Sequence, residues 1–224
     1  MRIMQTPPIE IETGRNPNAC VIVLHGLGAD GNDFVPICEQ LELDAVGPVR
    51  YVLPHAPQRS VTINGGYVMR AWYDILALGG QGGEDEPGLR ASQSLIEGLI
   101  DREIARGLSA ARIVLAGFSQ GCAMTLLAGL RHRERLAGLA GLSGYLPLAA
   151  CTAVERDPAN QATPVFMAHG SFDPMISAAR AIASRDALQA LGYAIEWHEY
   201  PMEHSVCLEE IRDLNQWLLR VLAR

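Results

Sequence analysis

A glycine-flanked serine stands between an apolar run and a helix-forming run near the middle of the chain. The motif is Gly117-Phe118-Ser119-Gln120-Gly121, which matches the pattern G-x-S-x-G. Residues 113–116 (IVLA) predict a strand before it, and residues 122–128 (CAMTLLA) predict a helix after it. This setting lifts the serine hydroxyl clear of a sheet, and the flanking glycines remove side chains that would clash at the sharp turn. The motif therefore predicts an α/β fold with Ser119 as a nucleophile.

The rest of the chain alternates in the same way between apolar runs and helical patterns. Several runs are continuously apolar, as is typical of strands that are buried on both faces. The expected strands cover residues 19–24, 50–53, 113–116, 136–142, 164–168 and 194–200. The expected helices cover residues 95–104, 123–130, 176–191 and about 205–222. This alternation predicts one α/β domain over residues 1–224, with a mostly parallel sheet that is covered by helices on both faces.

A serine hydroxyl becomes a good nucleophile when a histidine takes its proton and an acid orients that histidine. In this kind of fold the chain order is serine, acid, histidine, each after the carboxyl end of a strand. His204 lies between the last expected strand and the last expected helix, and Asp173 follows the strand at 164–168 by five residues. We therefore expect a catalytic triad of Ser119, Asp173 as the orienting acid, and His204 as the base.

Acyl transfer develops negative charge on the carbonyl oxygen of the substrate, which backbone N–H groups can stabilise. One such donor is expected from Gln120, the residue after the nucleophile. The other is expected from His25-Gly26-Leu27-Gly28, which follows the strand at 19–24. Leu27 is the candidate, because the glycines beside it let the backbone approach a substrate closely. Leu27 and Gln120 are thus the expected oxyanion hole.

As a set, these segments resemble the carboxylesterase/acyl-protein thioesterase family of α/β-hydrolases, also called the phospholipase/carboxylesterase family. The resemblance covers nearly the whole chain, and the bacterial carboxylesterase branch is the most similar. It is carried by residues 24–34 (LHGLGADGNDF), 54–57 (PHAP), 61–66 (VTINGG), 71–75 (AWYDI), 117–121 (GFSQG), 142–147 (LSGYLP), Asp173 and 204–206 (HSV). It implies hydrolysis of carboxylic esters, or of thioesters, through an acyl-enzyme, and it implies neither a cofactor nor a metal.

The resemblance also implies where a substrate binds. Trp72, with the loop around it, would line the acyl-binding groove, although a core position for this tryptophan is equally open from the sequence. Tyr73 and Leu76 of the same loop are further expected substrate contacts. Residues 76–88 are rich in glycine and acid, and they form either a surface connection or a flap beside the site.

The chain departs from the family pattern at two positions. Glu203 stands where a glycine usually precedes the histidine, and it places an acid beside the expected base. Cys122 stands where a glycine often follows Gln120-Gly121, and we expect it to be a small buried packing residue rather than a rival nucleophile.

Three functions fit these observations. The first is a carboxylesterase for short- to medium-chain esters, because the chain has little spare length for a large lid domain. The second is an acyl-protein thioesterase or lysophospholipase that acts on long acyl chains. The third is an inactive hydrolase scaffold that binds a partner, which the three competent triad residues disfavour.

Composition argues against several kinds of partner and leaves a small-molecule or lipid-like ester substrate as the expected one. A formal net charge of -7 argues against a nucleic-acid surface, which needs clustered cations. Five widely spaced cysteines without a CxxC pair predict no zinc site and reduced thiols in a cytoplasm. There is no run of roughly 18 apolar residues, so we expect no membrane span. The family resemblance is compatible with a homodimer.

Overall fold

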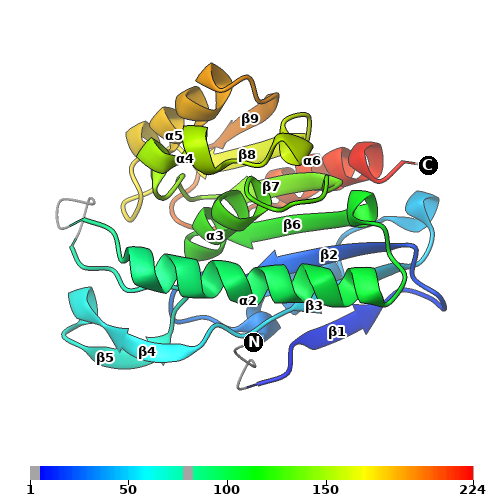
Figure 1. The fold of residues 1–224 in the computed structure, drawn as a ribbon, viewed down its shortest axis with the longest axis horizontal. Coiled ribbons are helices and arrows are strands. Elements are labelled where there is room, and N and C mark those ends of the chain that lie inside the picture. Colours follow the sequence, from blue (N-terminus) through cyan, green and yellow to red (C-terminus); the bar gives the residue numbers. More distant parts are fainter. Residues whose placement is uncertain (1–5, 78–82, 224) are drawn as a thin grey trace.

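The computed structural model describes residues 6–77 and 83–223. At its centre lies a seven-stranded sheet in the order β1-β3-β2-β6-β7-β8-β9 (Figure 1). Its strands are β1 (Ile9–Glu12), β2 (Ala19–Leu24), β3 (Val49–Leu53), β6 (Ile113–Phe118), β7 (Gly138–Leu142), β8 (Val165–Gly170) and β9 (Ile195–Tyr200). All neighbouring strands of this sheet pair in parallel except β1, which runs antiparallel to β3. A separate hairpin joins β4 (Gln58–Val61) to β5 (Tyr67–Arg70).

Helices cover both faces of the sheet (Figure 1). One apolar cluster includes side chains of α2 (Glu86–Ala105), α3 (Gln120–Gly129) and α5 (Ala178–Ala190). The opposite cluster includes side chains of α1 (Val35–Cys38) and α6 (Leu208–Val221), and the short helix α4 (Ala149–Glu155) follows β7. Strand β2 contributes Ile22 to the first cluster and Val21 to the second, because successive side chains point to opposite faces. This two-sided burial explains its uninterrupted apolar sequence.

The predicted fold class, a mostly parallel α/β sheet with helices on both faces, is confirmed. Some boundaries differ. Helix α2 begins at Glu86 rather than near residue 95, because the Asp85 side chain accepts the N–H of Gly88 and Pro87 suits a first turn. Helix α6 begins at Leu208 rather than near residue 205. The edge strand β1 and the β4–β5 hairpin were not expected from the sequence.

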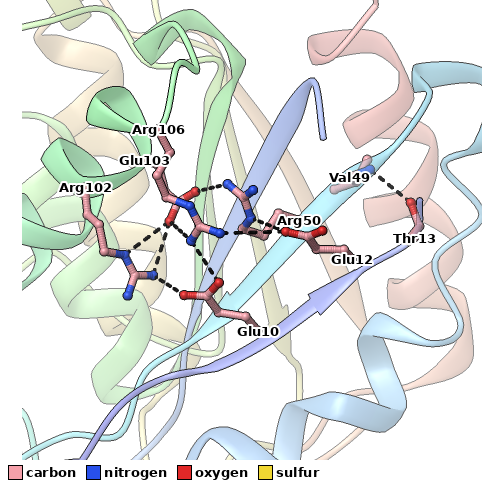
Figure 2. A network of polar contacts seen from close by, with 8 residues as sticks. All are labelled: Glu10, Glu12, Thr13, Val49, Arg50, Arg102, Glu103 and Arg106. Atoms are coloured by element: carbon pink, nitrogen blue, oxygen red, sulfur yellow. Dashed lines mark hydrogen bonds and ion pairs between the residues drawn. The ribbon is translucent and has the colours of Figure 1, made fainter. Parts of the chain in front are cut away.

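A network of charged side chains ties α2 to the β1 edge of the sheet (Figure 2). The network joins Glu10 and Glu12 of β1, Arg50 of β3, and Arg102, Glu103 and Arg106 of α2. At its centre the Glu103 carboxylate is fully buried and lies 2.5 Å from Arg50 Nη1. A buried carboxylate is tolerated when it is paired in this way. The network therefore anchors the C-terminal half of α2, whose opposite end follows the pocket-lining residue Asp85.

Candidate active site

Ser119 stands on the sharp turn between β6 and α3, with φ 58° and ψ −117°. A non-glycine residue with such a backbone costs of order 1–3 kcal/mol, so the surroundings must enforce it. The flanking glycines allow the close packing that does so. A Cβ on Gly121 would lie 1.9 Å from the carbonyl oxygen of Leu24, and a Cβ on Gly117 would lie 2.3 Å from the backbone of Gly121. The turn thus places the Ser119 hydroxyl beyond the carboxyl end of β6.

The structure brings the three expected triad side chains together. His204 Nε2 lies 2.9 Å from Ser119 Oγ, and His204 Nδ1 lies 2.7 Å from Asp173 Oδ2. Asp173 follows β8, and His204 lies between β9 and α6. Because β6, β8 and β9 are parallel, their carboxyl ends lie at one edge of the sheet, and residues distant in sequence meet there. The arrangement has the geometry in which a histidine can take a proton from a serine.

The Asp173 carboxyl group is held by a dense set of donors. Besides His204, its Oδ1 atom accepts the backbone N–H groups of Met175 at 2.8 Å and Ile176 at 2.9 Å. Burial by itself would raise the pKa of Asp173, but the hydrogen bonds from His204, Ile176 and Met175 outweigh it and lower the pKa. The carboxylate is therefore ionised wherever the protein is near neutral pH, and it can stabilise an imidazolium.

Two neighbours of the triad were not found from the sequence. His169, at the end of β8, is buried with its Nε2 atom 3.5 Å from Asp173 Oδ2 and 2.8 Å from the carbonyl oxygen of Ile176. The ring of Phe118 lies 4.7 Å from the ring of His204, centre to centre. The signal for both was their position at a strand end, with Phe118 directly before Ser119 and His169 four residues before Asp173.

The loop after β2 lies against the turn that carries Ser119. A Cβ on Gly26 would lie 3.3 Å from the Cβ of Ser119. Leu27 and Gln120, the expected oxyanion donors, both line the pocket that contains Ser119. Gln120 is the first residue of α3, so its N–H has no partner within the helix. Among the described backbone hydrogen bonds, the loop uses the N–H groups of Gly28 and Ala29 but not that of Leu27.

A pocket of about 770 Å³ contains the Ser119 and His204 side chains. This volume lies within the range of small-molecule sites in proteins. Apolar side chains make up much of its wall, among them Phe34, Ile37, Ile63, Ile75, Met175 and Val206. Tyr73 and Leu76, two of the expected substrate contacts, line it as well.

The third expected substrate contact, Trp72, does not line the pocket, and the structure gives it the core position that the sequence left open. Its side chain is fully buried, and its indole Nε1–H donates to the carbonyl oxygen of His25 at 2.8 Å. Its backbone N–H donates to Gln120 Oε1 at 3.0 Å, and Gln120 Nε2 donates to the carbonyl oxygen of Tyr73 at 2.9 Å. Trp72 is thus a core residue that links the loop after β2 to the first residue of α3.

The remaining expectations near the site concern Cys122, Glu203 and the segment 76–88. Cys122 is fully buried, and burial raises the pKa of its thiol to about 12, which fits a packing residue. The Glu203 side chain is exposed. The flap expectation falls in part on residues 78–82, which lie outside the described residues, and Leu76, Glu84 and Asp85 at either side of them line the pocket.

Over residues 6–77 and 83–223, no three His, Cys, Asp or Glu side chains gather as a metal ion would need. Of the helices that the structure describes, none combines the length and apolar character needed to cross a bilayer.

The sheet, the strained serine turn and the neighbouring histidine and carboxylate define an α/β-hydrolase. Residues 7–222 match the family model described as Phospholipase/Carboxylesterase. The chain belongs to this family and is a hydrolase of carboxylic esters or thioesters. The resemblance seen in the sequence is therefore confirmed for the family as a whole.

Individual relatives are similar over almost their full length. The chain is 38% identical to a protein named Acyl-protein thioesterase 1 from Neurospora crassa, over 99% of this chain and 94% of the relative. It is 40% identical to the protein of that name from Mycosarcoma maydis, over 99% of both. The crystal structure of Zea mays acyl-protein thioesterase 2 superposes with a TM-score of 0.82 at 26% identity, covering 96% of this chain and 99% of that one. These relatives are fungal and plant proteins, so they do not support the expected similarity to the bacterial branch.

Proposed function

We propose that the chain is a serine acyl hydrolase that cleaves thioesters and esters of long acyl chains, as an acyl-protein thioesterase does. The observation that carries the proposal is the largely apolar pocket of about 770 Å³ that opens onto Ser119. An apolar wall of this size gains free energy from burying an acyl chain, at about 0.8 kcal/mol for each methylene group. The relatives are named acyl-protein thioesterases, which supports the second function considered from the sequence better than the carboxylesterase for short- to medium-chain esters.

In the proposed mechanism Ser119 Oγ attacks the carbonyl carbon while His204 Nε2 accepts the hydroxyl proton. The N–H groups of Leu27 and Gln120 hold the negative oxygen of the tetrahedral intermediate. When the intermediate collapses, the bond to the leaving thiol or alcohol breaks and His204 gives it the proton. A water molecule then attacks the acyl-enzyme by the same route, which releases the carboxylic acid and restores Ser119. Asp173 keeps the Nδ1–H of His204 pointed at itself throughout.

A chain-length series tests the proposal. We expect kcat/KM for aryl esters and acyl thioesters to rise from acetyl to at least dodecanoyl, by up to about fourfold for each methylene group that the pocket buries. Leu76→Ser should flatten the long-chain part of the series, because Leu76 lines the pocket. Val154→Ser is the control, since Val154 is an apolar side chain that is 89% exposed on α4. A maximum at acetyl or butyryl would instead support the short-chain carboxylesterase.

Trp72 should act as a positioning residue for the oxyanion hole. Trp72→Phe removes the indole N–H and leaves the buried carbonyl oxygen of His25 without its donor. The loop that contains His25 also carries Leu27, whose N–H is the proposed oxyanion donor. Loss of one oxyanion donor lowers kcat about 10²–10³-fold in other serine hydrolases, and we expect displacement of the Leu27 N–H to lower kcat about tenfold. Because the acyl pocket is left intact, the change should fall on kcat rather than KM.

The matched control for this variant is Trp217→Phe. Trp217 is also a buried indole, but it packs on Phe166 in the apolar cluster on the opposite face of the sheet. Thermal unfolding of both variants measures the loss of stability that they share. Equal kcat values for the two variants would contradict the positioning role of Trp72.

A further inference from the structure

A single arginine lies in the wall of the pocket that contains Ser119. Of the described residues that line this pocket, Arg180 alone carries a guanidinium group and none is a lysine. The guanidinium carbon of Arg180 lies 3.4 Å from the centre of the Tyr145 ring. The hydroxyl of Tyr145 is in turn 2.8 Å from the hydroxyl of the buried Tyr73. Stacking on an aromatic face holds a guanidinium group in one plane and leaves the N–H groups at its edge able to donate.

The backbone around this arginine is fixed to the segment that carries Tyr145. Ser184 Oγ donates to the carbonyl oxygen of Arg180 at 2.9 Å, and the same oxygen atom accepts the N–H of Leu146 at 2.9 Å. The side chain of Ser177 caps the helix by accepting the N–H of Arg180. These bonds hold the first turn of α5 against the stretch after β7, so the backbone of Arg180 is fixed relative to the segment that carries Tyr145.

No carboxylate forms a direct ion pair with Arg180 within the described chain. Its neighbour Arg185 pairs with Asp186 at 2.7 Å, but no acid lies within 4.0 Å of the Arg180 guanidinium in residues 6–77 and 83–223. Residues 1–5, 78–82 and 224 include no Asp or Glu. A cation in a largely apolar pocket has lost part of its hydration, so a partner anion is favourable there.

The four acids of the same pocket wall accept hydrogen bonds from other groups, beginning with Asp33, which accepts the N–H of Asp30 at 2.7 Å. Glu84 Oε2 accepts the N–H of Leu148 at 2.9 Å. Asp74 accepts both the N–H and the hydroxyl of Thr62. Asp85 accepts two backbone N–H groups and lies 3.7 Å from Arg59. Arg180 is thus the one arginine of this wall, and in the described chain it forms an ion pair with none of these acids.

We propose that Arg180 binds an anionic group, a carboxylate or a phosphate, on the ester or thioester that Ser119 attacks. This inference rests on the proposed function, since it gives a further requirement for the substrate of the same site. The planar edge of a guanidinium group matches two oxygen atoms of a carboxylate or phosphate at once. A substrate with an apolar acyl chain and an anion would therefore satisfy both the walls of the pocket and its one arginine.

Two matched pairs of esters test whether Arg180 binds an anion on the substrate. They also show whether that anion belongs to the acyl part or to the leaving group. In the first pair, mono(4-nitrophenyl) adipate carries a carboxylate in the acyl part, and its ω-methyl ester is the neutral partner. In the second pair, the hexanoate ester of 3-hydroxyphenyl phosphate carries the charge in the leaving group, and the dimethyl phosphate triester is the neutral partner. We expect the anionic member of one pair to exceed its partner about tenfold or more in kcat/KM, as a charged hydrogen bond allows.

Variants assign any such preference to Arg180. Arg180→Met should reduce the ratio between anionic and neutral partners about tenfold, and Arg180→Lys should keep part of it as a point charge. Arg185→Met is the control on the same helix, because Arg185 pairs with Asp186 and lies 5.0 Å from the ring of Trp197. A purely structural role for Arg180 would lower the rates of both partners alike. High salt should weaken the preference of the wild-type enzyme.

Each contrary outcome is distinct. Equal kcat/KM values within both pairs for the wild-type enzyme would overturn the inference about Arg180. The proposed function would still stand, because the esters are turned over. A preference that survives in Arg180→Met would overturn it equally. If that variant does not fold, the wild-type ratio and Arg180→Lys still decide. No turnover of any ester would overturn the proposed function, and the inference with it.

Discussion

Replacement of Ser119 by alanine is expected to lower kcat by about 10⁴–10⁶-fold, the range seen when a serine hydrolase loses its nucleophile. Among the described residues, the hydroxyl within hydrogen-bond distance of His204 Nε2 is that of Ser119. Cys122 is near in sequence, but its thiol is fully buried, and burial raises its pKa to about 12. A thiol that stays protonated and out of reach of substrate is a poor nucleophile. The measurements are turnover of an aryl ester and covalent labelling by a fluorophosphonate probe, both of which should be lost.

Ser171→Ala is the matched control for this experiment. Ser171 is an exposed serine directly after β8, two residues before Asp173, and its hydroxyl has no part in the proposed mechanism. We expect this variant to label and turn over as the wild-type chain does. A wild-type chain that neither labels nor turns over any ester would favour the inactive scaffold, and a Ser119→Ala variant that still labels would show that the nucleophile is elsewhere.

The serine, the histidine and the acid could be proposed from the sequence because their placement follows from chain order. Ser119 is marked by a local pattern, since the turn needs glycine at 117 and 121 for packing within a few ångströms. Asp173 and His204 are 31 residues apart, yet each follows a parallel strand, and parallel strands end at one edge of the sheet. Topology alone therefore brings them together.

The role of Trp72 could not be read from the sequence in the same way. A tryptophan beside Tyr73 in a loop fits a groove wall or a core equally well. The difference lies in partners that are distant in sequence, namely the carbonyl oxygen of His25 and the amide of Gln120. Arg180 is a similar case, because its sequence neighbours say nothing of the Tyr145 ring on which it stacks.

Exposed and edge elements were missed for another reason. The β4–β5 hairpin has exposed side chains on much of its length, including Tyr67 at 69% and Val68 at 54%, so it lacks the apolar run that marks a buried strand. Strand β1 alternates partly buried and exposed residues over only four positions. It is joined to the sheet by its pairing with β3 and by ion pairs with Arg50 and Arg106, which no local pattern reveals (Figure 2).

Replacement of Asp173 by asparagine should leave the fold of the site intact and still lower kcat by about 10⁴-fold, as happens in a serine protease of another fold. The carboxylate accepts the Nδ1–H of His204, which leaves Nε2 free to take the proton of Ser119. An asparagine amide can donate to Nδ1 instead, which places the ring proton on Nε2 and removes the base. It also removes the negative charge that stabilises the imidazolium.

The pKa of Asp173 gives this prediction its pH dependence. Burial opposes ionisation, but the bonds from His204, Ile176 and Met175 lower the pKa of Asp173 below its usual value. A carboxyl group with a lowered pKa in the folded state contributes stability above its unfolded pKa, and this contribution is lost as the pH falls through the folded value. Protonation of Asp173 should therefore reduce the wild-type rate only below the usual pKa of an aspartate, about 3.9, and Asp173→Asn should be slow at every pH from 5 to 9. Asp186→Asn, at an exposed acid on α5 that pairs with Arg185, is the control. If kcat of the Asp173→Asn variant were within threefold of kcat of the Asp186→Asn control, the orienting role proposed for the Asp173 carboxylate would be excluded.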